Sequence, residues 1–271
     1  MKTPSSGTSH QAAITGSGQP GDLGPDPVQL PQYSRPKVLA VWAAAALPMA
    51  ALAWVVTPAV AGDGATPQRL AVTLLVALTI GLIWQFVLVV VLVRREAHEG
   101  SWTSFRERLW VRAPRGATRR GGRLWWWVAA YALGLAVLDS VPFGPTGPDA
   151  RNFGSFLESA AGQATFHHAW ALYALVAVEL FFNTVIGEEL LFRGLLLPRM
   201  NGAFGRADWV VNGVLFGFYH LHEPWVIPNA VLTGFLCAHP TKRFRSSLMG
   251  IAIHSIESVF FLVVLLPVVI G

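Results

Sequence analysis

Residues 70–93 form an unbroken stretch of 24 residues without a charged side chain. At a rise of about 1.5 Å per residue, a helix of this length crosses the roughly 30 Å hydrocarbon layer of a bilayer. Further apolar segments cover residues 38–61, 124–141, 168–198, 209–223, 226–239 and 247–269. They lack the ten-residue alternation of a membrane β-barrel. The sequence therefore predicts an all-α, polytopic transmembrane bundle of about seven to eight membrane helices with a polar intramembrane cavity.

The composition agrees with a membrane protein, because only 13% of the residues are charged, against roughly 25% in soluble domains. The segments 209–223 and 226–239 are short and separated by Glu223 and Pro224, so we expect either two short spans or a partly re-entrant pair. Cys237 is the single cysteine, which excludes an internal disulfide and a zinc site built from several thiolates.

Nine arginines lie between Arg94 and Arg123, in one hydrophilic loop between apolar segments. This is the positive-inside pattern, so we expect the loop and the N-terminus to be cytoplasmic, in a bacterial plasma membrane. The clustering also argues against nucleic-acid binding. Three regions follow: a disordered tail over 1–36, N-terminal transmembrane helices over 37–167 with the Arg-rich cytoplasmic loop 94–123, and a catalytic helical core over 168–271.

Four polar positions in the last apolar segments are predicted to lie at one depth. Glu188 and His220 are each eleven residues from the expected cytoplasmic end of their helices, or about 16 Å deep at the helical rise. His254 and Ser258 lie at about 13 and 19 Å by the same measure. Ionisable groups inside a membrane are costly and usually functional, so we place the active site here.

The spacing within each helix assigns roles. Glu189 and Arg193 are four residues apart, which predicts an ion pair, and Glu188 points elsewhere as a free general base. Phe216 is placed to pack against the His220 ring by the same spacing. His254 and Ser258 share a face and are expected to point two donors at one oxyanion. Because water must reach this depth, we expect Gly187, Gly194 and Gly217 to open a passage from the cytoplasm or inner leaflet.

Three motifs carry a resemblance to a known family. They are Glu-Glu-Leu-Leu-Phe-Arg at 188–193, Phe-Gly-Phe-Tyr-His at 216–220 and His-Ser-Ile-Glu-Ser at 254–258. In order and spacing the chain resembles the CAAX-protease and bacteriocin-processing family of intramembrane endopeptidases over roughly residues 168–269. The last motif departs from the family pattern, which usually has asparagine at the position of Ser258.

The resemblance implies hydrolysis of a peptide bond in a membrane-associated peptide or protein. Glu188 and His220 would activate the attacking water, and Glu189 with Arg193 would organise the site. His254 and Ser258 would hold the oxyanion, with Glu257 as a second polar group on that helix.

A metal-free reaction is favoured for this site, and the alternative is a zinc site formed by Glu188, His220 and His254. Two other functions remain open. One is a non-catalytic member acting as an immunity or scaffold protein, which the Ser258 departure favours. The other is a proton-coupled transporter that uses the Glu/His cluster as a relay.

Other polar residues in the apolar segments are predicted to have structural roles. Asn183 and Asn212 are expected to make interhelical hydrogen bonds, and Glu179 and Asp139 to be solvated or paired near the ends of their segments. On a continuous helix His222 would be turned about 200° away from His220, which predicts a position outside the site.

Overall fold

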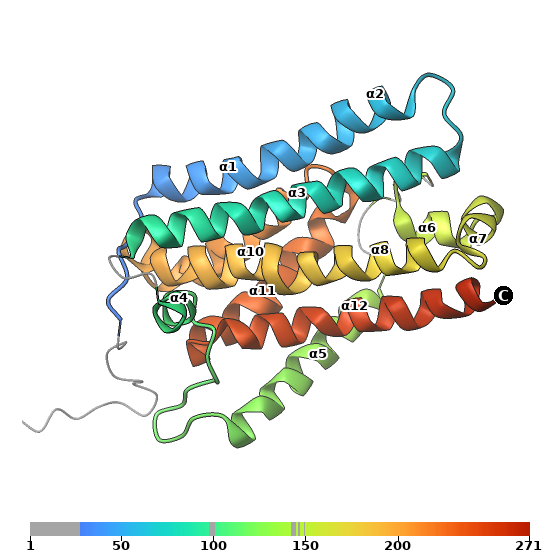
Figure 1. Ribbon diagram of the computed structural model, residues 1–271. Coiled ribbons are helices and arrows are strands. Elements are labelled where there is room, and N and C mark those ends of the chain that lie inside the picture. The colour runs from blue at the N-terminus through green and yellow to red at the C-terminus, as the bar shows by residue number, and fades with distance from the viewer. Residues whose placement is uncertain (1–27, 98–100, 142–144, 146, 149) are drawn as a thin grey trace, which may run out of the picture.

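The computed structural model describes residues 28–97, 101–141, 145, 147–148 and 150–271. Long helices run side by side and form an elongated bundle (Figure 1). At one end lie α4 and the start of α1; at the other lie α6, α7, the connection between α2 and α3, and the C-terminus (Figure 1). We call these the arginine-rich end and the α6–α7 end. The described residues contain no β-strand, so the all-α prediction is confirmed.

The helical elements follow the apolar segments of the sequence. In chain order, the α-helices are α1 Arg35–Ala51, α2 Thr57–Ala61, α3 Pro67–Glu96, α4 Trp102–Arg108, α5 Trp126–Asp139, α6 Phe153–Glu158, α7 Ala160–Phe166, α8 Trp170–Phe181, α9 Asn201–Phe204, α10 Asp208–Tyr219, α11 Ile227–Phe244 and α12 Ser247–Ile270. The π-helical segments are η1 Leu52–Val56, η3 Phe182–Gly187 and η4 Leu190–Leu196. The 3₁₀ turns are η2 Gly122–Trp125, η5 Leu197–Arg199, η6 Gly205–Ala207 and η7 Pro224–Val226.

Four helical rods among the described residues are long and apolar enough to cross a membrane. They are Arg35–Ala61, Pro67–Glu96, Trp170–Arg199 and Ser247–Ile270. The protein is therefore an integral membrane protein. The helices α5 and α10 have 14 and 12 residues, so the predicted count of seven to eight membrane helices stays a prediction.

Residues before the predicted end of the N-terminal tail are part of the folded bundle. Tyr33 is only 2% exposed, and its hydroxyl donates to Glu96 at the end of α3. Its backbone N–H donates to the carbonyl of Arg199 at 2.8 Å, and α1 begins at Arg35. The boundary at residue 36 is therefore wrong, because one aromatic side chain joins the core at the arginine-rich end. The rest of the predicted tail, residues 1–27, lies outside the described residues.

The short helices α10 and α11 pack directly against each other. A Cβ added to Gly217 would lie 2.2 Å from the Val231 Cγ2 atom, and one added to Gly213 would lie 2.4 Å from the Phe235 ring. Small residues allow the two backbones to approach in this way. The pair carries His220 and meets the rod Trp170–Arg199, which carries Glu188.

Candidate active site

The four catalytic candidates come from three elements. Glu188 and Glu189 lie between η3 and η4, His220 follows α10, and His254 with Ser258 lies on α12. Their side chains are buried, with exposed fractions of 3% for Glu188, 0% for Glu189, 7% for His254 and 8% for Ser258, while His220 is partly buried. Burying such polar groups costs free energy unless they find partners, so their contacts define the site.

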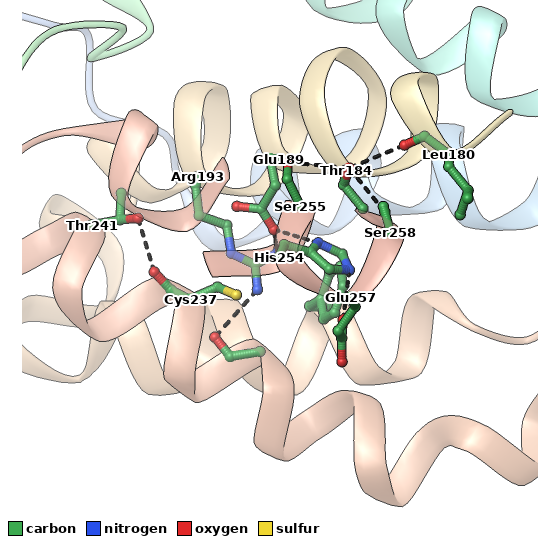
Figure 2. A network of polar contacts seen from close by, with 12 residues as sticks. Leu180, Thr184, Glu189, Arg193, Cys237, Thr241, His254, Ser255, Glu257 and Ser258 are labelled. Carbon is green, nitrogen blue, oxygen red and sulfur yellow. Dashed lines mark hydrogen bonds and ion pairs between the residues drawn. The ribbon is translucent and has the colours of Figure 1, made fainter. Parts of the chain in front are cut away.

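Glu189 is the centre of a buried ion network. Its Oε1 atom lies 3.1 Å from the Arg193 guanidinium, as the spacing predicts, and 3.0 Å from the His254 Nδ1 atom. The Glu189 Oε2 atom has no hydrogen-bond partner, and a Cβ added to Gly250 would lie 2.4 Å from it. Gly250 therefore leaves the room that lets α12 approach the carboxylate. Figure 2 shows Glu189 between Arg193 and His254.

Arg193 reaches the neighbouring helices with the rest of its side chain. It is fully buried, lies 4.1 Å from the centre of the Phe216 ring and donates to the carbonyl of Gly234 at 3.3 Å. A cation over a desolvated aromatic ring is worth about 2 kcal/mol. Arg193 thus connects η4 to both α10 and α11.

Glu188 contacts a different set of side chains. With its nitrogen turned toward Glu188, the amide of Asn183 donates to both carboxylate oxygens at 2.9 and 2.7 Å. The hydroxyl of Tyr219 is a further hydrogen-bond partner of Glu188, and it accepts a hydrogen bond from Gln85 on α3. Two neutral polar groups, Asn183 and Tyr219, therefore hold the Glu188 carboxylate, and no cation among the described residues forms an ion pair with it.

His220 has a fixed orientation and a fixed tautomer. Its ring packs edge-on against Phe216 with 5.0 Å between the centres, as the spacing predicts. The Nδ1 atom lies 2.9 Å from the carbonyl oxygen of Phe216. A carbonyl only accepts, so Nδ1 carries the hydrogen, and in the neutral ring the Nε2 atom is an acceptor. No hydrogen bond joins His220 to Glu188, and Tyr219 lies beside both.

His254 and Ser258 do not form the predicted pair of free donors. The His254 Nδ1 atom bonds to Glu189, and its Nε2 atom lies 3.5 Å from Glu257. The hydroxyl of Ser258 donates to Thr184 at 3.2 Å (Figure 2). Carboxylates face both ring nitrogens of His254, an arrangement that suits the imidazolium with a hydrogen on each nitrogen. In this form the loose contact to Glu257 leaves the Nε2–H as the donor that can turn to another acceptor. Ser258 instead connects α12 to η3.

The zinc alternative finds no ligand set in the described part of the chain. There, no three His, Cys, Asp or Glu side chains are arranged to hold a metal ion, and this includes Glu188, His220 and His254.

Several polar residues lie elsewhere than the helical spacing predicts. Asn212 donates to the carbonyl of Phe192 on a neighbouring element, as expected, but Asn183 contacts Glu188 in its own rod. His222 stacks on His220 with 5.4 Å between the ring centres, because α10 ends at Tyr219 and the helical angle no longer applies. Asp139 is exposed and accepts a hydrogen bond from Asn229.

The three glycines expected to open a water passage are close-packing positions. A Cβ added to Gly187 would lie 2.4 Å from the carbonyl oxygen of Phe182, and one added to Gly194 would lie 3.2 Å from that of Leu109. Gly217 meets Val231 at 2.2 Å. The prediction is therefore wrong at all three positions, because neighbouring atoms, and not open space, lie where a side chain would be.

A cavity with a mostly apolar wall lies beside Asn183, the hydrogen-bond partner of Glu188. It has a volume of about 190 Å³ and is lined by α3, α8, η3, Phe261 and the segment before and within α6. Its polar lining residues are Arg151, Glu179, Asn183 and Glu223. Glu179, which was expected to be solvated or paired near the end of its segment, lies in the wall of this cavity.

Tyr219, Gln85 and Thr184 were not identified from the sequence. Tyr219 precedes His220 and Thr184 precedes Glu188 by four residues, so both lie in or beside the motifs. Gln85 has a weaker signal, since it is the single amide in the apolar stretch 70–93. A polar side chain at the centre of a membrane helix usually has a partner on another helix, and here the partner is Tyr219.

Comparisons with known proteins agree with the motifs. Residues 169–260 match the family model of Rce1-like type II CAAX prenyl endopeptidases. No match was found among the curated proteins or among the solved structures. The matched residues contain all three motifs and every candidate catalytic residue. Over residues 169–260, the chain is therefore similar to the Rce1-like type II CAAX prenyl endopeptidases, which confirms the resemblance predicted from its motifs.

Proposed function

We propose that the protein is an intramembrane endopeptidase that hydrolyses a peptide bond of a membrane-associated peptide or protein. The observation that carries this proposal is the buried carboxylate of Glu188, held by neutral partners beside the Glu189–Arg193–His254 network and inside the Rce1-like segment. A carboxylate that no cation neutralises is free to accept a proton, which is what a general base does.

In the proposed reaction, a water molecule between Glu188 and His220 attacks the carbonyl carbon of the scissile bond. As the new C–O bond forms, the water gives one proton to the Glu188 carboxylate, assisted by the Nε2 acceptor of His220. The carbonyl oxygen becomes an oxyanion, which the Nε2–H of His254 stabilises. Glu188 then passes the proton to the amide nitrogen, the C–N bond breaks, and an acid and an amine leave.

The remaining residues have positioning roles in this proposal. Glu189 and Arg193 fix His254, and Phe216 holds both Arg193 and His220. Ser258 supports η3 through Thr184 and does not bind the oxyanion. Glu257 keeps the Nε2 atom of His254 oriented until the substrate arrives.

For the orientation in the membrane, we propose that the arginine-rich end is cytoplasmic. The exposed residues Arg94, Arg95, Arg206 and Arg243 lie at or next to this end of their helices. Positive charge is enriched on the cytoplasmic side of membrane proteins.

The test compares new protein N-termini in membranes that contain the wild type, Glu188→Gln or the control Glu158→Gln at equal abundance. Glu158 lies on α6, is exposed and receives the same isosteric change. We expect cleavage products with the wild type and Glu158→Gln and none with Glu188→Gln. Identical products from all three proteins, or none from any of them, would overturn the proposal and favour a scaffold role.

A further inference from the structure

The cavity next to Asn183 is large enough to hold water and has four polar residues in a mostly apolar wall. Its volume of about 190 Å³ is several times the volume that one water molecule needs. Glu179 and Glu223 line it, and among the described residues their carboxylates have no hydrogen-bond or ion-pair partner. A water molecule is held where a cavity is roomy enough and offers it about two to four polar partners, and Arg151, Glu179, Asn183 and Glu223 provide such partners in the otherwise apolar wall.

The cavity leads directly to Glu188. Glu179 and Asn183 are four residues apart on the same rod and both line the cavity. The amide of Asn183 then bonds both oxygens of Glu188. A single side chain therefore separates the cavity from the proposed general base.

Toward the arginine-rich end, the same rod is tightly packed beyond Leu190, and a second, mostly apolar cavity lies beside Arg94, Ile186 and Leu190. Every residue from Leu190 to Met200 is buried, and Leu191, Phe192, Leu195 and Leu196 have no exposed surface. Arg199 at this end pairs with Glu96 at 2.7 Å.

We infer that the hydrolytic water reaches Glu188 from the α6–α7 end, through the cavity of Glu179 and Glu223 and past Asn183. The role of this route in catalysis rests on the proposed function, whereas the presence of water in the cavity is independent of it. Glu179 and Glu223 serve as acceptors for the water, and Asn183 passes it to the carboxylate that it holds. The route enters from the end opposite to the arginine-rich loop.

The test is thiol labelling from each side of sealed membrane vesicles. Replacement of the single cysteine, Cys237→Ala, gives a background in which Glu179→Cys and Glu223→Cys each provide one reactive thiol. The probe is a methanethiosulfonate with a permanently charged trimethylammonium group, which does not cross the bilayer. Glu158→Cys on α6 and Arg206→Cys at the arginine-rich end are exposed controls that mark the two sides.

We expect Glu179→Cys and Glu223→Cys to react from the side that labels Glu158→Cys, at least tenfold faster than from the side that labels Arg206→Cys. Labelling from the Arg206 side, or from neither side, would overturn the inference. Two cysteine positions are used so that the misfolding of one variant still leaves a result. This measurement needs no proteolytic activity, so it separates the water route from the proposed function.

A second measurement fills the cavity. Val176 is 1% exposed and lines the cavity, whereas Val178 on the same helix is 46% exposed and faces away. We expect Val176→Phe to lower the turnover at least tenfold and to slow labelling of Glu179→Cys, and Val178→Phe to change neither. Full turnover with the cavity filled would overturn the route even if Glu188 proves essential for proteolysis.

Discussion

The amide of Asn183 donates to both carboxylate oxygens of Glu188, five residues further along the same rod. On a regular α-helix two residues five positions apart lie about 140° apart, so they would not meet. The π-helical segment η3, Phe182–Gly187, adds a residue to the turn and brings them together. The orientation of the proposed general base therefore depends on a local widening of the helix.

Asn183→Leu is expected to lower proteolytic turnover by about 10- to 100-fold, because a hydrogen bond to a charged group is worth about 1.5–3 kcal/mol. The measurement is the initial cleavage rate with purified protein in lipid vesicles. Asn201→Leu, at an exposed asparagine, is the control and should keep the wild-type rate. Equal rates for both variants would show that Asn183 does not position Glu188.

Arg193→Met is expected to lower the free energy of unfolding by about 3–5 kcal/mol, since it leaves the buried carboxylate of Glu189 without its cation. Thermal unfolding in detergent measures the change, and Arg206→Met is the exposed control. The double variant Arg193→Met, Glu189→Gln should recover part of the loss. A stability equal to that of the control would contradict a structural role for this ion pair.

Gly217→Ala is expected to destabilise the contact between α10 and α11 by about 1–3 kcal/mol, the usual cost of overpacking. The new Cβ would lie 2.2 Å from Val231, and 2.9 Å from its backbone nitrogen, which cannot rotate away. Gly134→Ala on α5 is the matched control, because its Cβ would lie 3.6 Å from Leu236, in ordinary contact. Equal melting temperatures for the two variants would contradict the close packing.

The pKa of Tyr33 predicts how the free energy of unfolding changes with pH in the alkaline range. Burial and the hydrogen bond to Glu96 raise the pKa of Tyr33 above the ordinary value of 10.0. The raised pKa favours the folded state below pH 10, and this stabilisation is lost as the pH rises from 10 through the folded-state pKa. We expect the wild type to lose more stability than Tyr33→Phe in this range, measured as denaturation midpoints. Parallel curves for the two proteins would contradict the shift.

The sequence alone determined the features that depend on short-range spacing and on composition. The membrane helices follow from apolar length. The contacts Glu189–Arg193 and Phe216–His220 follow from the i,i+4 spacing, which holds wherever the backbone is close to helical. The three motifs were sufficient to predict the family resemblance over residues 169–260.

The tertiary structure decided which polar groups meet, because these contacts depend on the packing of helices and on departures from regular helical geometry. The π-helical segment η3 brings Asn183 to Glu188. Because α10 ends at Tyr219, the His222 ring can stack on the His220 ring. The approach of α12 to η3 pairs Ser258 with Thr184. Close packing at Gly194 and Gly217, and the cavity at Glu179, depend on which atoms of other elements fill the space beside a residue. No periodicity within one helix contains that information, since it is a property of the surfaces of several helices together.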